Sequence, residues 1–217
     1  MDNNQSSVSI VKALGWTISY FLLMVVVSLL DIVIWRKTSL QIAPYLNLAV
    51  LSILSGLFLR KVYKNESFTI SLQIHIKDIL IACLCAVVFF LLLDNFLDPV
   101  FESVFPSSEV EYQEMLQSLK AQPIVTFFRV VLLSPVVEET LMRGFILTGM
   151  QKHYNTLIAL IISTMLFGLL HFNMVQTLSA IISGFALGII YIKTKNLSTC
   201  ILTHALYNSI SFFYILH

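Results

Sequence analysis

The chain has 217 residues, of which 58% are hydrophobic and only 12% are charged, and its formal net charge at pH 7 is +1. Soluble domains carry about 25% charged residues, so this composition excludes an ordinary soluble protein and indicates an integral membrane protein. The nearly neutral charge gives no support for a nucleic-acid partner.

Apolar runs long enough to cross a bilayer, which takes about 20 residues each, follow one another along nearly the whole chain. We therefore predict an all-α fold, a polytopic transmembrane helical bundle of about seven spans that forms a single integral membrane domain over residues 1–217. The predicted spans are residues 8–35, 40–60, 79–97, 124–150, 156–173, 174–193 and 197–217.

Residues 98–122 form an extended polar interruption between the third and fourth predicted spans. The acidic residues of this segment are Asp98, Glu102, Glu109, Glu111 and Glu114. We predict an interfacial amphipathic segment or lid, and the alternative is a solvated acidic loop.

Lysine and arginine are distributed unevenly between the two sides of the predicted spans. The side with the N-terminus would carry Lys12, Arg60, Lys61, Lys64, Lys77, Lys152, Lys193 and Lys195. The opposite side would carry Arg36, Lys37, Lys120 and Arg129. The positive-inside rule then predicts a cytoplasmic N-terminus and, with seven spans, a C-terminus outside.

Three charged residues, Glu138, Glu139 and Arg143, lie near the middle of the 124–150 span. Each costs about 2.5–3.5 kcal/mol at a helix centre, so the cluster must face the bundle or a water-filled cavity and is a functional-site hypothesis. Glu139 and Arg143 are four residues apart and stack on one helix face, whereas Glu138 is turned about 100° away. Glu138 is therefore free to act as a general base on water, and the alternative is a structural ion pair. Pro135 is expected to free backbone groups nearby.

Two further polar pairs lie on other predicted helices, each four residues apart: Phe167 with His171, and His204 with Asn208. Asn208 could orient the His204 ring or donate to a developing oxyanion. Glu138 and the two histidines could bind Zn²⁺ or polarise water directly, and the residues leave both options open.

The three clusters resemble a known family. EETLMR at 138–143, FGLLH at 167–171 and HALYN at 204–208 are similar to the ordered motifs E-E-x-x-x-R, F-x-x-x-H and H-x-x-x-N/B of the CAAX protease and bacteriocin-processing (CPBP) intramembrane proteases, also called the Abi or type II CAAX prenyl endopeptidase family. The resemblance covers about residues 130–215 and implies that residues 124–217 form the catalytic core. It implies a metallo- or glutamate-type endopeptidase with Glu138, His171, His204 and Asn208 as catalytic residues, and with Glu139, Arg143 and Phe167 in support. If Zn²⁺ is used, the implied ligands are Glu138, His171 and His204.

The short polar parts resemble the bacterial branch of this family, which is linked to bacteriocin or pheromone maturation and to self-immunity. This implies a bacterial cell membrane, with membrane lipid around the chain and a peptide or membrane-associated protein as substrate. Two alternatives remain, a non-catalytic bacteriocin-immunity or scaffold protein, and a proton-coupled transporter that uses Glu138 and His171 as a relay.

Overall fold

A computed structural model describes residues 7–65, 70–171 and 173–216, and these residues form helices without strands. The α-helices are α1 (Ile10–Leu30), α2 (Arg36–Thr38), α3 (Ala43–Asn65), α4 (Ile76–Leu92), α5 (Asp98–Val104), α6 (Pro106–Ala121), α7 (Pro123–Thr126), α8 (Ser134–Glu139), α9 (Thr148–Met150), α10 (Thr156–Gly168), α11 (Met174–Thr194) and α12 (Leu197–Leu216). Short π-helical segments join some of them: η1 (Asp31–Trp35), η2 (Leu93–Leu97), η3 (Phe127–Leu133) and η4 (Thr140–Leu147). The predicted all-α fold is confirmed.

Five helices among the described residues are long and apolar enough to cross a membrane: Ile10–Thr38, Ala43–Lys64, Ile76–Val104, Met174–Thr194 and Leu197–Leu216. The chain is thus an integral membrane protein. The other two predicted spans are also helical, but residues 123–150 hold the charged cluster at their middle and α10 has only 13 residues. The number of seven spans therefore stays a prediction.

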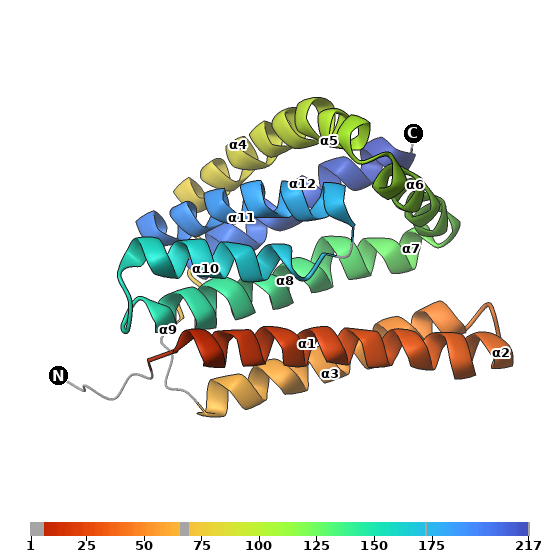
Figure 1. Ribbon diagram of the computed structural model, residues 1–217, viewed down its shortest axis with the longest axis horizontal. Coiled ribbons are helices and arrows are strands. Elements are labelled where there is room, and N and C mark those ends of the chain that lie inside the picture. Colours follow the sequence, from red (N-terminus) through yellow and green to blue (C-terminus); the bar gives the residue numbers. More distant parts are fainter. Residues whose placement is uncertain (1–6, 66–69, 172, 217) are drawn as a thin grey trace.

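The helix over residues 123–150, built from α7, η3, α8, η4 and α9, lies at the centre of the molecule (Figure 1). It contacts α3 on one side and α10 and α12 on the other, while α12 packs chiefly on α4 and α10 packs on α11. Every residue from Leu141 to Leu147 is buried. A helix that is covered on all sides can hold charged groups away from lipid, and this explains how the cluster is tolerated.

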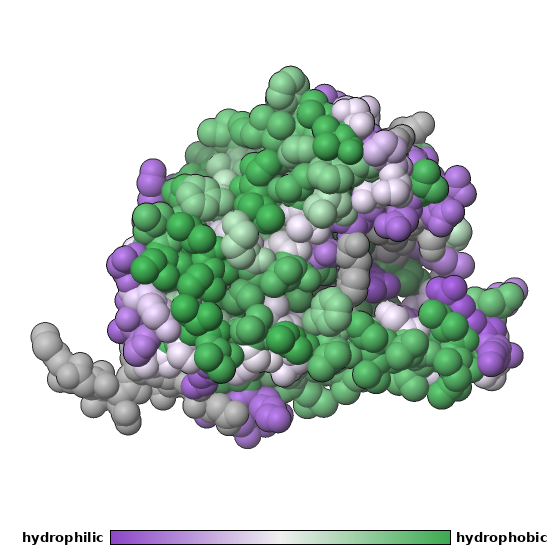
Figure 2. All heavy atoms as spheres, viewed as in Figure 1, coloured by the Kyte–Doolittle hydropathy of each residue, from purple (hydrophilic) through white to green (hydrophobic). Residues whose placement is uncertain are grey.

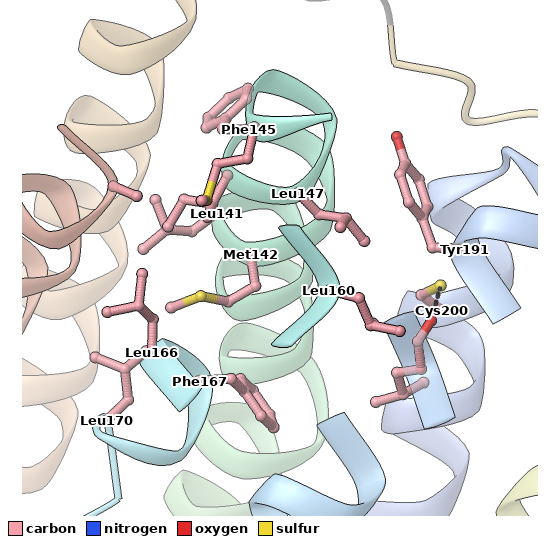
Figure 3. Close-up of a cluster of buried hydrophobic side chains, with 14 of the residues drawn as sticks. Leu141, Met142, Phe145, Leu147, Leu160, Leu166, Phe167, Leu170, Tyr191 and Cys200 are labelled. Carbon is pink, nitrogen blue, oxygen red and sulfur yellow. Dashed lines mark hydrogen bonds between the residues drawn. The ribbon is translucent and has the colours of Figure 1, made fainter. Parts of the chain in front are cut away.

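The hydrophobic core surrounds this central helix (Figure 3). Helix association in a membrane depends on close van der Waals packing and on small residues at the contacts. Gly188 of α11 gives such a contact, because a Cβ there would lie 2.3 Å from Leu160 Cδ1. The core side chains labelled in Figure 3 are Leu141, Met142, Phe145, Leu147, Leu160, Leu166, Phe167, Leu170, Tyr191 and Cys200.

The polar segment 98–122 is helical, so the alternative of an acidic loop is wrong. It forms α5 and α6, and α6 contacts α5, α7, α11 and α12. Figure 1 shows α6 at the right-hand end of the molecule, opposite the end that holds the N-terminus.

The end of the bundle near the N-terminus is held by contacts between distant segments. The Val8 N–H donates to the Gly149 carbonyl at 3.0 Å, and the Leu197 N–H donates to the Ser71 carbonyl at 3.0 Å. The Ile10 N–H donates to the Tyr154 hydroxyl at 3.3 Å. These bonds bring the start of α1, the turn after α9, the segment before α4 and the start of α12 to one end.

Candidate active site

Glu139 is the buried centre of a polar cluster that joins three helices. Its carboxylate forms an ion pair with Arg143, with Nε 3.1 Å from Oε2, and accepts a hydrogen bond from Nη1 at 3.2 Å. His204 Nδ1 of α12 lies 3.0 Å from Oε1, and Arg143 Nη2 donates to the Gly184 carbonyl of α11 at 2.8 Å. The expected Glu139–Arg143 pair is confirmed, and its added partners reduce the cost of burying both charges.

Glu138, the preceding residue, has a different environment. Its side chain is half-buried, and within the described residues its carboxylate has no hydrogen bond or ion pair. Its charge interacts with His171 and with the hydroxyl of Tyr20. The two adjacent carboxylates thus differ in their partners. The Glu139 carboxylate is bound by Arg143 and His204, whereas the Glu138 carboxylate is free to bind another group.

Phe167 lies between the two histidines. Its ring makes edge contacts with the His171 and His204 rings, with centroids 5.3 and 5.9 Å away. The Arg143 guanidinium carbon is 4.6 Å from the Phe167 centroid, which is within the range of a cation–π contact. The aromatic ring therefore fixes the spacing of both histidines relative to the charged pair.

His171 lies in the segment after α10, three residues beyond the last helical residue. Thirteen residues of helix span about 20 Å, less than the roughly 30 Å of a bilayer core, so α10 is too short to cross a membrane by itself. His171 Nδ1 is 3.2 Å from the Phe167 carbonyl oxygen, and the His171 carbonyl accepts from Thr177 Oγ1 at 3.1 Å. The short helix thus presents His171 within the bundle.

Asn208 supports the backbone of the central helix. In η3 the Ser134 N–H donates to the Arg129 carbonyl, a bond across five residues. The next bond in this register would run from residue 135 to the Val130 carbonyl, but Pro135 has no N–H. Asn208 Nδ2 donates to that Val130 carbonyl at 2.9 Å, which leaves the second N–H of its amide without a hydrogen-bond partner among the described residues.

The π-helical segment η4 follows Glu139 directly, and its carbonyls also receive side-chain partners. Ser163 Oγ donates to the Met142 carbonyl at 3.0 Å, and Thr148 Oγ1 donates to the Arg143 carbonyl at 2.8 Å. Such segments are rare in proteins and are frequent at functional sites.

The sequence grouped both histidines with Glu138, but in the structure His204 pairs with Glu139. Among the described residues, no group of three His, Cys, Asp or Glu side chains is arranged to hold a metal ion. His204 uses Nδ1 on Glu139 and keeps Nε2, so Zn²⁺ binding by Glu138, His171 and His204 stays a prediction.

Two residues of the site were missed in the sequence analysis, Ser163 and Gly184. Gly184 allows α11 to approach closely, because a Cβ there would lie 2.7 Å from Phe167 Cδ1 and 3.4 Å from Arg143 Nη2. The signal for Gly184 is the spacing G-x-x-x-G over residues 184–188, a pattern of closely packed membrane helices.

Comparison with known proteins adds one match. Residues 120–210 match the family model described as type II CAAX prenyl endopeptidase Rce1-like. No curated protein and no solved structure matches the chain. The matched range includes the three motifs, from Glu138 to Asn208.

Proposed function

Through residues 120–210 the chain belongs to the type II CAAX prenyl endopeptidase (Rce1-like) family, and from this premise we propose that it hydrolyses a peptide bond in a peptide or membrane-associated protein. The observation that carries the proposal is the contrast between two adjacent glutamates. Glu139 is buried and paired with Arg143 and His204, whereas the Glu138 carboxylate lacks such a partner in the described part of the chain.

In the proposed reaction, Glu138 is the general base. A water molecule held between Glu138 and His171 transfers a proton to the carboxylate as its oxygen attacks the scissile carbonyl carbon. The tetrahedral intermediate then collapses, the C–N bond breaks, and the proton carried by Glu138 passes to the leaving nitrogen. The products are a carboxylic acid and an amine, so the reaction consumes only water.

Asn208 and His204 are the proposed partners of the oxyanion. Asn208 has one N–H left after its bond to Val130, and His204 donates from Nε2 in its imidazolium form, in which Nδ1–H also pairs with Glu139. Donors fixed in advance cost no reorganisation when negative charge develops on the oxygen. Their anchoring by the protein therefore supports this role.

The proposed catalytic type is the glutamate type. This type needs a carboxylate that can take a proton from water, and the Glu138 carboxylate has no hydrogen bond or ion pair to another described residue. We therefore assign the proton transfers to protein side chains.

Substituting Glu138→Gln tests the proposal, because it removes the base and preserves the shape of the side chain. Loss of a general base lowers rates by about 10²–10⁴-fold, so cleavage of a quenched peptide library by the purified protein should fall at least about 100-fold. Lys61→Gln, which also removes an exposed charge but lies on α3, is the control and should cleave like wild type. Equal activity of wild type and Glu138→Gln would contradict the assignment of the base. If wild type cleaves no peptide, a non-catalytic immunity or scaffold protein would explain the motifs better.

A further inference from the structure

Asn173 connects α6 to the segment that carries His171. Its side chain is only 7% exposed and is used at both ends. Oδ1 accepts from the N–H groups of Val175 at 3.0 Å and Gln176 at 3.4 Å, which caps α11. Nδ2 donates to the Ser108 carbonyl in the first turn of α6 at 2.6 Å. One buried amide therefore serves two separate elements.

The bonds that hold His171 in place do not depend on the bond to α6. Thr177 Oγ1 donates to the His171 carbonyl at 3.1 Å, and the Thr177 N–H donates to the Asn173 carbonyl at 2.8 Å. His171 Nδ1 contacts the Phe167 carbonyl within its own element. Loss of the Nδ2 bond would remove the tie between Asn173 and α6 and leave these contacts intact.

The position of α6 is compatible with a helix that covers the His171 side of the candidate site. It contacts α5, α7, α11 and α12, so it crosses the end of the bundle where the His171 segment lies. Figure 2 shows hydrophilic side chains at this end of the molecule, beside a hollow between the main bundle and the hairpin of α1 and α3. Several α6 side chains are exposed, among them Val110, Glu114 and Lys120.

We propose that α6 is a lid over the His171 side of the active site, that Asn173 is the positioning residue that holds it closed, and that the substrate polypeptide reaches Glu138 past α6. This inference rests on the proposed peptidase function. A site that is open for only a fraction of the time binds its substrate more weakly in proportion to that fraction. Loss of the hydrogen bond from Asn173 to Ser108 should therefore lower KM.

Asn173→Asp and Asn173→Ser separate the two uses of the side chain. Both keep an oxygen that caps α11, because Asp and Ser are strong N-cap residues, and both lose the Nδ2 amide that reaches the Ser108 carbonyl. A neutral hydrogen bond of ordinary strength shifts a closed–open equilibrium by about fivefold. In the variants, the rate of trypsin cleavage after Lys120, divided by the rate after Lys152, should thus rise about fivefold. In peptide cleavage, KM should fall about fivefold and kcat should change by less than about twofold.

Asn155 gives the matched control, because it caps α10 through Oδ1 to the Ile158 N–H at 2.9 Å. Asn155→Asp and Asn155→Ser should leave the Lys120 cleavage rate and KM unchanged. Unchanged values in both Asn173 variants, or equal changes in the Asn155 variants, would overturn the lid. A fall in kcat at constant KM would also overturn it, because Asn173 would then serve only His171. The trypsin assay works in the Glu138→Gln background, so it tests the lid even if the proposed function fails.

Discussion

At the residue scale, Glu138 and Glu139 are neighbours in the chain with separate physical roles. Glu139 compensates the buried charge of Arg143, which is 1% exposed, while Glu138 has no comparable duty. A charge that loses its partner in a buried site destabilises the fold strongly. A substitution at position 139 should therefore mainly lower the stability of the fold, and one at position 138 should mainly lower the rate of peptide cleavage.

Glu139→Gln is expected to destabilise the protein by about 3 kcal/mol or more, because it leaves the Arg143 charge uncompensated inside the bundle. In a chain of this length, 1 kcal/mol corresponds to about 2–4 °C, so the apparent Tm in detergent should fall by about 6 °C or more. Glu138→Gln is the adjacent control and should keep the wild-type Tm. Similar Tm values for the two variants would contradict the separation of roles.

The separation of the two glutamates could be predicted from sequence, because neighbouring residues on a helix are turned about 100° apart. The partner of His204 could not be predicted in this way. It depends on how α12 is rotated and shifted against the central helix, and that is decided by packing between residues 65 positions apart. The motif identifies the residues of the site but leaves their pairing open.

At the element scale, α11 shapes the candidate site without supplying one of the proposed catalytic groups. Gly184 lets this helix approach Phe167 and Arg143, and its carbonyl accepts the bond from Arg143 Nη2. A methyl group at this position would press on the ring that lies between the two histidines. The packing of α11 should therefore control the geometry of the site.

Gly184→Ala is expected to cost about 1–3 kcal/mol by overpacking, and to lower peptide cleavage about tenfold as Phe167 shifts both histidine rings. Gly56→Ala on α3 is the matched control, since a Cβ there meets nothing within 4 Å. Alanine is the better helix former by about 0.8–1.0 kcal/mol, so this control should be neutral or slightly stabilising. Thermal unfolding and cleavage rates measured on both variants check the prediction, which fails if both behave alike.

The existence of most helices could be predicted from the apolar runs, but their internal irregularities could not. The segments η3 and η4 flank α8, and their freed carbonyls are satisfied by Asn208, Ser163 and Thr148. Asn208 and Ser163 lie on other helices, so the irregular backbone depends on tertiary contacts. The prediction that Pro135 frees backbone groups nearby is confirmed, because Asn208 binds the Val130 carbonyl, which Pro135 leaves without a backbone donor.

At the scale of the whole molecule, the two ends of the bundle differ in charge. The end with the N-terminus gathers the start of α1, the turn after α9 and the starts of α4 and α12. Lys12, Lys77 and Lys152 belong to these segments. The opposite end carries α6, with Glu111, Glu114 and Lys120 exposed. The charge asymmetry read along the sequence thus corresponds to two ends of one folded body.

This asymmetry leads to a test of orientation, because cytoplasmic segments near membrane spans are enriched in Lys and Arg. We expect Lys120→Cys to react with a membrane-impermeant thiol reagent added to intact cells, and Lys152→Cys to react only after permeabilisation. The three native thiols give the background: Cys200 is buried, while Cys83 and Cys85 lie on α4 within a predicted membrane span, where the reagent does not enter. The opposite labelling pattern would contradict the predicted orientation and would place Lys152 outside and Lys120 in the cytoplasm. With the expected pattern, α6 and the proposed substrate entrance face the outside, so the enzyme would act on polypeptides presented at the outer surface.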